Sequence, residues 1–503
     1  MSRGPTIPMI LPMDSEMHVT MRRAAAPSDV ASPWSHWFAS YRAYVGLRRL
    51  CFIGAVAVIA PGCTMIPLFD QPAPPVPGQY PGVTAAQEGH AADLAWGNFF
   101  AEERLRKLIE LALANNRDLR VAVLNVEQSR AQYHITRSAS FPEVDAGASY
   151  TRAHVAGLNA DHTEQWSATL GSTAYEVDLW GRVRSLNRQA LENYFATEEG
   201  RHSAQISLVA EVANQYYQLR QAEEQIQLAQ QTLEAVQESY KLNKATFEAG
   251  ASNELDLRTA EGQVQTAKIS LLTYQRQLAL SQDALALLLG QPLPSELPAA
   301  RSFNDTNLLA AIPAGLPSEL LQRRPDILQA EHTLKAANAN IGVARAAFFP
   351  AITLTATVGA TSSDLTKLFS GGTGLWNFSP QITLPIFTGG RNRATLESAK
   401  VGKRIEIANY EKAIQTAFRE VADALVSKDS YAQQIKEEET LVIAQQRRYE
   451  LANARYRQGQ DSYLNVLSAQ QDLYSAQQEL LQAQRNQLVS QISLYSALGG
   501  GWK

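Results

Sequence analysis

The feature that most restricts how this chain can fold is an internal duplication with an offset of about 209 residues. The run Phe247-Glu-Ala-Gly250 recurs as Tyr456-Arg-Gln-Gly459, and Phe141-Pro142 recurs as Phe349-Pro350. Solenoid repeats have periods of roughly 20 to 50 residues, so this period indicates a duplicated domain instead. We therefore predict two tandem copies of one structural unit, over residues 102–300 and 301–503.

Each predicted copy begins with a helix, continues with two strands and ends with a long helical hairpin. The Phe-Pro pair ends the first helix because proline cannot continue a helix. The next helical stretch lacks proline and is rich in Ala, Gln, Leu and Glu, which favour helix, and it turns at a glycine into a shorter return helix. The predicted helices are about 102–138, 183–248 and 253–289 in the first copy and about 317–347, 392–457 and 462–498 in the second.

The predicted strands alternate apolar and polar residues. In the second copy Ile352, Leu354, Ala356 and Val358 alternate with threonines and a glycine, and a second alternating run extends over 376–386. The first copy shows a weaker alternation over 144–150 and 166–170. Strict alternation over about ten residues is typical of a membrane β-barrel. The alternative is the half-buried sheet of a soluble protein.

Four strands are too few to close a membrane barrel, and open sheet edges cannot face lipid. Subunits must therefore pool their strands, which gives eight strands from two chains or twelve from three. A barrel of eight strands is filled by its own side chains, whereas a larger one can hold water. A water-filled duct through the barrel therefore favours the trimer. In the trimer the long helices would form a hollow cylinder, with apolar stripes between neighbouring helices.

The N-terminal region has the features of a secretory signal. Arg48 and Arg49 precede a short apolar run that ends at Ala60-Pro-Gly-Cys63, the order of a signal peptide. A cysteine directly after small residues resembles a bacterial lipobox, so we predict Cys63 as the lipid anchor. A plain secretory signal with unmodified Cys63, or a signal anchor, is the alternative. We assign 1–62 to an N-terminal extension and signal peptide and 63–101 to the anchor and a proline-rich linker.

Composition gives no indication of chemistry. The net charge of −4 does not favour nucleic-acid binding, and the two cysteines cannot form a CxxC metal cluster. The histidines are isolated, without metal-ligand spacing, and we find no P-loop and no nucleophile elbow. We expect no enzymatic activity, no metal, no cofactor and no nucleic-acid partner.

Four motifs in a fixed order carry a family resemblance. They are Ala114-Asn-Asn-Arg-Asp-Leu119, Tyr175-Glu-Val-Asp-Leu-Trp-Gly-Arg182, Arg323-Arg-Pro-Asp-Ile327 and Ala336-Ala-Asn-Ala-Asn-Ile-Gly342. Together with the duplication, residues 63 to 500 resemble the TolC-like outer membrane factors of tripartite efflux systems, in particular the lipoprotein (NodT-type) branch. The resemblance implies an α+β membrane protein in which three subunits share a twelve-stranded transmembrane β-barrel and a long periplasmic α-helical barrel. A small mixed equatorial domain would use the linker, residues 291–316 and the C-terminus.

The resemblance also implies a function and partners. The chain would be a lipid-anchored outer-membrane channel, extending into the periplasm as a passive duct for small toxic compounds or drugs. Its partners would be its own homotrimer, outer-membrane lipid, a periplasmic adaptor and an inner-membrane pump of the resistance-nodulation-division class. The alternatives are the outer-membrane component of a type I protein secretion system, or a periplasmic coiled-coil scaffold without a pore. The lipobox and the Arg-Arg-Pro-Asp motif favour efflux, and two hairpins with membrane-type strands argue against a scaffold.

We predict that the hairpin tips dock the adaptor. Gly250 and Gly459, with Phe247 and Tyr456 three residues earlier, lie at the ends of the long helices farthest from the predicted strands. The alternative is that these glycines only reverse the chain direction, and both roles are compatible.

A gate is expected at the start of the return helices. In related ducts the beginning of the second return helix lines the narrowest periplasmic end, where acidic side chains can form rings. Here the matching positions are neutral, so we predict a gate with an apolar and a polar part. The alternative is that these side chains only pack between helices. The predicted gate residues are Leu464, Asn465, Ser468 and Gln471 in the second copy and Leu255, Asp256 and Thr259 in the first.

Overall fold

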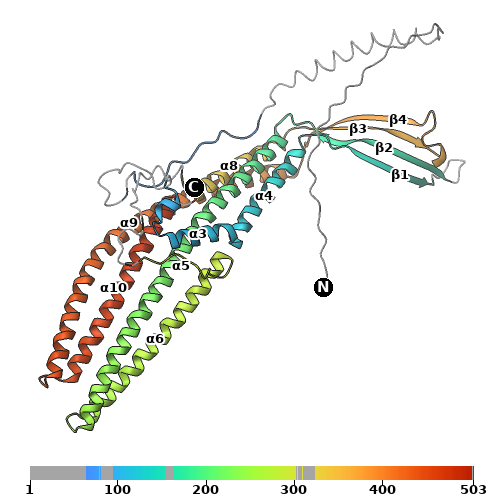
Figure 1. Cartoon of the computed structure of the whole chain (residues 1–503). Helices are drawn as coiled ribbons and strands as arrows, with labels where there is room; N and C mark the ends of the chain where they lie inside the picture. The colour runs from blue at the N-terminus through green and yellow to red at the C-terminus, as the bar shows by residue number, and fades with distance from the viewer. Residues whose placement is uncertain are drawn as a thin grey trace, which may run out of the picture. The chain divides into compact units, whose positions relative to one another are not determined.

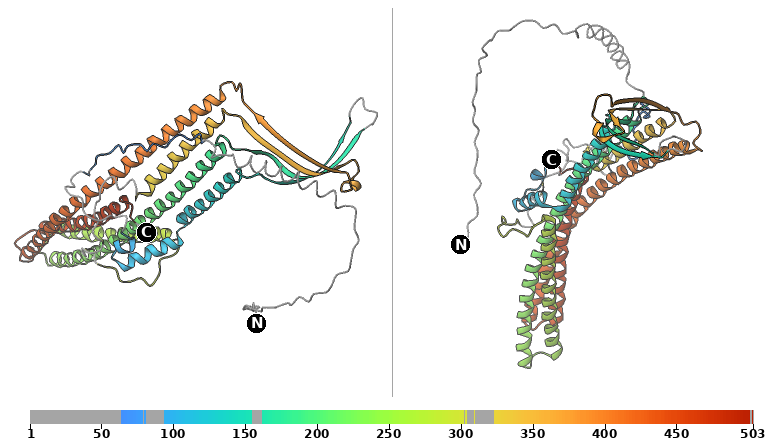
Figure 2. Two further views of the ribbon diagram at one scale, coloured as in Figure 1. Left: turned by 90° about the horizontal axis from the view of Figure 1, so that it is seen from above. Right: turned by 90° about the vertical axis from the view of Figure 1, so that its right-hand side faces the viewer.

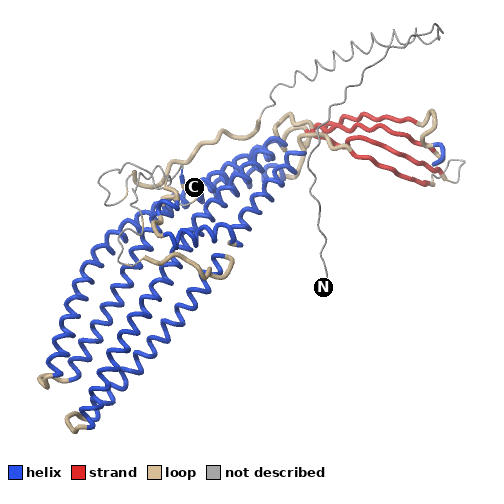
Figure 3. Tube along the Cα trace, in the orientation of Figure 1, coloured by secondary structure: helices blue, strands red, loops and turns tan. Residues whose placement is uncertain are grey.

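The structure is a computed structural model. It describes residues 64–78, 80, 94–154, 162–301, 303, 309, 323–500 and 502. All of these belong to one compact unit, Gly62–Lys503. Within this unit the strands lie together at one end of the helices, and the hairpin turns lie at the other (Figures 1 and 3). The predicted signal peptide and Cys63 lie outside the described residues.

The long hairpins form where the sequence predicts them. The first pairs α5 (Arg182–Glu248) with α6 (Glu254–Leu289), and the second pairs α9 (Arg391–Arg457) with α10 (Tyr463–Ala497). Helices α5 and α9 each contain 67 residues, which at a rise of 1.5 Å gives a length of roughly 100 Å. The proline-free, Ala- and Gln-rich composition explains why neither helix is interrupted.

The prediction of one continuous helix over 102–138 is wrong. The chain forms α3 (Glu103–Asn115) and α4 (Arg117–Ser138), with a break at Asn116. The Asn116 side chain accepts a hydrogen bond from the Leu119 amide and donates one of 2.9 Å to the Leu288 carbonyl at the end of α6. Asn116 therefore caps α4 and joins it end to end with α6, which satisfies groups that a helix terminus otherwise leaves unpaired.

The second copy has the same junction, made with a different side chain. The predicted helix over 317–347 is interrupted at Arg324, which is extended, and α8 (Pro325–Ala346) begins with Pro325 in its first turn. Residues 317–322 of that prediction lie outside the described residues. The Arg324 guanidinium donates a hydrogen bond of 2.9 Å to the Ala497 carbonyl at the end of α10. Each copy thus places a short helix in line with its return helix.

The four strands form one antiparallel sheet in the order β1-β2-β3-β4. The predicted run over 376–386 extends too far. Its strand ends at Thr383, which pairs with Ala351, the first residue of the neighbouring strand, and Pro385 has no amide to continue the ladder. The strands are β1 (Asp145–Ala153), β2 (Thr163–Glu176), β3 (Ala351–Ser362) and β4 (Gly374–Thr383).

Two glycines allow close approach of the central strands. A Cβ at Gly171 would lie 2.2 Å from the Ala356 carbonyl oxygen, and a Cβ at Gly359 would lie 2.1 Å from the Ala168 carbonyl oxygen. Glycine at such positions permits the strong coiling that a barrel wall requires. The strands accordingly curve along their length (Figure 2).

The main hydrophobic core lies around the helix junctions. Phe99, from the short helix α2 (Trp96–Phe99), stacks on Tyr495 with 4.1 Å between ring centroids. Phe100 forms an isolated bridge with Leu309. The Tyr216 hydroxyl donates a 2.5 Å hydrogen bond to the buried Glu102 carboxylate. This packing of short helices and an isolated β-bridge against α5 and α10 corresponds to the predicted equatorial domain.

The junction geometry predicts opposite effects for two glycine-to-alanine changes. Gly290 has φ +67°, and a Cβ there would lie 2.4 Å from the Asn115 carbonyl oxygen. We expect Gly290→Ala to destabilise the protein by about 2 kcal/mol or more, because a left-handed alanine is strained and the neighbouring backbone leaves no space. The measurement is the apparent thermal unfolding midpoint in detergent.

The matched control is Gly402→Ala in the interior of α9, where a Cβ meets no atom within 4 Å. We expect a gain of about 0.5–1 kcal/mol, since glycine is a poor helix former. A lower midpoint for Gly402→Ala, or an unchanged one for Gly290→Ala, would contradict this account.

Candidate functional site

The sheet has one apolar face and one polar face. Residues directly opposite in an antiparallel ladder point to the same side, so the pairs Leu170↔Val358 and Val358↔Trp376 define one face. Most side chains on this face are apolar, and Trp376 is 80% exposed. The apolar residues on this face are Ala146, Ala148, Tyr150, Trp166, Ala168, Leu170, Ile352, Leu354, Ala356, Val358, Ala360, Trp376, Phe378, Pro380 and Ile382, and the polar residues that share it are Arg152, Glu164, Ser172 and Ser362.

The opposite face carries small hydroxyl and amide side chains. Ser149 and Ser167 form a hydrogen bond of 2.7 Å across β1 and β2, and Gln165 donates a 3.0 Å hydrogen bond to Thr361 across β2 and β3. A sheet with an exposed apolar face on one side and a polar face on the other is typical of the wall of a membrane barrel with an aqueous lumen.

A β-bulge in β2 shifts the alternation at the helix-side end of the sheet. The register changes between Ser172 and Tyr175, and Ala174 has φ +57°. Because one extra residue is inserted, Tyr175 joins the apolar face and Glu176 joins the polar face. Glu176 then accepts a 2.8 Å hydrogen bond from Arg182. This bulge could not be predicted from the sequence, since an alanine gives no signal for a left-handed conformation.

Both hairpin tips end in the same turn. Gly250 and Gly459 have φ +73° and +70°, and each amide bonds to the carbonyl of the residue three positions earlier, Phe247 or Tyr456. The following residues bond back to Thr246 and Arg455, which completes a Schellman motif. Both glycines are exposed, with open space around them.

The two aromatic tip residues differ in their surroundings. Phe247 is 37% exposed. Tyr456 instead packs against the buried Tyr463 and donates a 2.8 Å hydrogen bond to Asn243, a fully buried residue of α5. Burial raises the pKa of Tyr463 to about 12, so this hydroxyl stays neutral. Tyr456 therefore connects the two hairpins, beside a groove of about 1280 Å³ that both tips line.

The predicted apolar gate residues are exposed on the surface of the subunit. Leu464 is 66% exposed and Leu255 is 74% exposed, each in the first turn of a return helix. Asp256 is half-buried and its amide is capped by Asn253, while the Thr259 hydroxyl donates a 2.7 Å hydrogen bond to the Leu255 carbonyl. Exposed leucines at this end are available to contact other subunits.

The predicted polar gate residues already have partners within the subunit. Asn465 donates a 2.5 Å hydrogen bond to Asp461, and Gln471 donates a 3.4 Å one to Gln263 of α6. Ser468 accepts a 3.3 Å hydrogen bond from Arg448. Arg448 also forms a 2.5 Å ion pair with Asp472 and so joins α9 to α10. The role of Arg448 was missed, because no sequence spacing connects it to Ser468.

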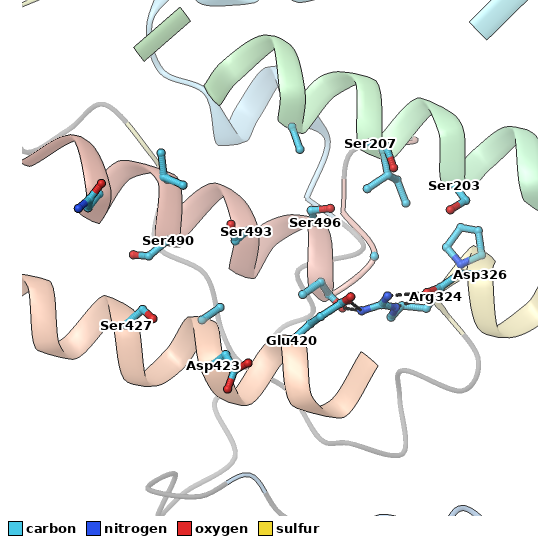
Figure 4. Close-up of a pocket in the computed structure, with 18 of the residues that line it drawn as sticks. Ser203, Ser207, Arg324, Asp326, Glu420, Asp423, Ser427, Ser490, Ser493 and Ser496 are labelled. Atoms are coloured by element: carbon cyan, nitrogen blue, oxygen red, sulfur yellow. Dashed lines mark hydrogen bonds and ion pairs between the residues drawn. The ribbon is translucent and has the colours of Figure 1, made fainter. Parts of the chain in front are cut away.

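An open pocket of about 660 Å³ lies at the junction of α8 and α10 (Figure 4). Arg324 is buried at one end, where it binds both carboxylate oxygens of Asp326 and, at 2.8 Å, Glu420. Burial opposes the charge, but these carboxylates raise the pKa of Arg324. The charge of the guanidinium is thus balanced by the carboxylates of Asp326 and Glu420. The serines that line the pocket are Ser203, Ser207, Ser427, Ser490, Ser493 and Ser496.

No group of three or more His, Cys, Asp or Glu side chains among the described residues could hold a metal ion. No helix in the described part of the chain is long and apolar enough to cross a membrane.

Comparison with known proteins decides the family. A family model described as "Outer membrane efflux protein" matches this chain twice, over residues 108–291 and 316–500. The chain belongs to the outer membrane efflux protein family. The two matches follow the two copies of the duplicated unit.

Similar members of the outer membrane efflux protein family have been named and solved. The "probable efflux pump outer membrane protein TtgC" of Pseudomonas putida is 47% identical over 465 residues, which cover 90% of this chain and 96% of the relative. The "cation efflux system protein CusC" of Escherichia coli is 40% identical and covers 89% of this chain and 98% of its own length. The open state of the MtrE outer membrane channel of Neisseria gonorrhoeae has a TM-score of 0.82 at 40% identity, covering 88% of this chain and 99% of that chain.

These findings confirm the predicted family, fold class and function. The chain is an outer-membrane component of an efflux pump. Its fold combines a long helical barrel with a β-barrel that three subunits share, four strands from each. As a pump component it acts together with other proteins of the pump.

Proposed function

We propose that the chain forms a passive, lipid-anchored duct. An adaptor docks onto its hairpin tips, and an inner-membrane pump of the resistance-nodulation-division class delivers the substrates to it. The observation that carries this proposal is the sheet, whose inner face offers neutral hydroxyl and amide groups such as Ser149, Ser167 and Gln165. A lumen of this kind passes solutes without strong binding. The absence of enzymatic activity belongs to the same proposal, because the energy for transport would come from the pump.

We further propose small toxic organic compounds as the exported substrates. A relative that is 46% identical is named a toluene efflux pump outer membrane protein, and one that is 47% identical is named an antibiotic efflux pump outer membrane protein. These names also favour efflux over type I protein secretion. The assignment can be tested by deleting the gene and measuring growth in the presence of toluene and of antibiotics. The deletion strain should be more sensitive than wild type.

The lipid anchor is supported by the segment that follows Cys63. Arg345 donates a 3.3 Å hydrogen bond to the Met65 carbonyl, and Asn338 donates a 2.9 Å one to the Pro67 carbonyl. A Cβ at Gly342 would lie 2.7 Å from a carbon of the Ile66 side chain. We call residues 64–71 the N-terminal strap. Its start lies along the end of α8 that leads into β3, at the sheet end of the helices.

We predict that Cys63 carries lipid and is the first residue of the mature protein. Mass spectrometry of the mature N-terminus should find a diacylglyceryl group on this cysteine. The Cys63→Ala protein should still insert, because the sheet supplies its own apolar belt. A mature N-terminus at another residue, or an unmodified Cys63, would show that the anchor is absent.

We predict that bulky residues at the tips block adaptor docking. Ala251→Trp and Gln460→Trp change exposed tip positions beside Gly250 and Gly459. Crosslinking to the adaptor in cells should fall at least fivefold, an order-of-magnitude expectation for steric exclusion at a packed contact, while trimers persist on native gels. Ala251→Ser is the control and should crosslink normally. Undiminished crosslinking of both tryptophan variants would exclude the tips as the docking site.

We predict that Leu464 closes the resting gate. Leu464→Ala should raise single-channel conductance or open probability in planar bilayers, because it removes apolar bulk from the constriction. Leu464→Met keeps the apolar volume and should remain closed. A carboxylate at position 468 is expected to have little effect on the gate, since Arg448 lies 3.3 Å from the Ser468 hydroxyl and would neutralise it. Identical traces for wild type and Leu464→Ala would place the gate elsewhere.

A further inference from the structure

The run Gly181-Arg-Val-Arg184 of the first copy recurs as Gly390-Arg-Asn-Arg393 in the second, but its surroundings differ between the two copies. In the first copy it lies at the start of α5, directly after β2. Arg182 is held by Glu176 at 2.8 Å, and Arg184 is held by Asp178 at 3.1 Å. Asp178 also accepts hydrogen bonds from the first backbone amides of α5. Both arginines of this copy are therefore neutralised locally.

In the second copy both acidic residues are missing. The positions that match Glu176 and Asp178 are Pro385 and Phe387. The corresponding arginines, Arg391 and Arg393, are exposed and form no ion pair with any residue that the structure describes. This copy thus presents two unneutralised positive charges at the start of α9.

The same loop exposes its apolar side chains almost completely. Ile386 is 93% exposed and Phe387 is 90% exposed. Leu384 and Ile386 follow Ile382 at intervals of two, so they continue the apolar alternation of β4 beyond its last ladder pair at Thr383. The loop is therefore continuous with the lipid-facing face of the sheet, at its helix-side rim.

We propose that residues 384–393 form a phospholipid-binding anchor at the inner edge of the outer membrane. Ile386 and Phe387 enter the acyl region, and Arg391 and Arg393 bind the phosphates of anionic headgroups. Apolar side chains next to basic ones are the composition that binds membrane interfaces, and two free cations next to exposed aromatic surface complement an anionic lipid. The proposal rests on the lipid-facing side of the sheet but requires neither the lipid on Cys63 nor the duct function.

The test measures bound lipid on the full-length trimer purified in mixed micelles. The probes are phosphatidylglycerol and phosphatidylcholine, and native mass spectrometry counts the retained lipids. Wild type should prefer phosphatidylglycerol. In the double variant Arg391→Gln/Arg393→Gln the ratio of bound phosphatidylglycerol to bound phosphatidylcholine should fall roughly tenfold, because each basic residue contributes to attraction by an anionic surface. The control Arg258→Gln/Arg447→Gln removes the same charge near the hairpin tips and should behave as wild type.

A second variant tests the contrast between the copies directly. Pro385→Glu/Phe387→Asp introduces the acidic residues of the first copy and keeps both arginines. The new carboxylates should pair with Arg391 and Arg393, as Glu176 and Asp178 pair with Arg182 and Arg184, and so abolish the preference for phosphatidylglycerol. Retained preference in both double variants would overturn the proposal.

Two further measurements separate this inference from its competitors. If the loop instead contacts a neighbouring subunit, Arg391→Gln/Arg393→Gln trimers will dissociate in micelles of phosphatidylcholine alone, and this outcome also overturns the proposal. Intact trimers under those conditions support it. Conductance in phosphatidylcholine bilayers tests the duct separately, since a wild-type protein without pores would refute the duct and leave the lipid result standing.

Discussion

The hydrogen-bonding edges of the sheet determine the rest of this structure. In the described part of the chain β1 and β4 each pair on one side only, and their outer edges expose unpaired amides and carbonyls next to an apolar face. Such edges are not tolerated in lipid. They become satisfied when β4 of one subunit meets β1 of the next and the sheet closes. The helices that continue from these strands are then arranged around the same axis, so the barrel in the membrane also sets the helical cylinder below it.

Residue types that restrict the backbone were sufficient to predict most of the fold. The long helices end within a residue or two of the predicted positions because glycine marks their turns and proline is absent from their interiors. The break at Asn116 was not predictable, since Asn116 stabilises it through a carbonyl 172 residues away. The bulge at Ala174 was equally hidden, because alanine strongly prefers other conformations. The candidate gate was located by analogy, but the ion pair between Arg448 and Asp472 that adjoins it depends on how α9 packs against α10.

The two copies show how one structural role is met by different chemistry. Asn116 and Arg324 both join a short helix to a return helix, the first with a neutral amide and the second with a buried cation that needs Asp326 and Glu420. The loops after β2 and β4 also differ in charge. The first copy pairs its arginines with carboxylates, and the second copy leaves its arginines without them among the residues that the structure describes. Because the unit is duplicated, each junction and each loop occurs twice in the subunit. One occurrence can keep a purely structural role while the other acquires a different one.

The N-terminal strap has a consequence for the order of events during export. Its first residues bind Asn338 and Arg345, which lie 271 and 280 residues later in the chain, and Gln71 binds Tyr410, which lies 339 residues later. This early segment of the chain therefore has no binding site until most of the chain has been translocated. Contacts of such long sequence separation form slowly. Strap docking is accordingly a late event in maturation, and it distinguishes a completed subunit from a chain that is still being secreted.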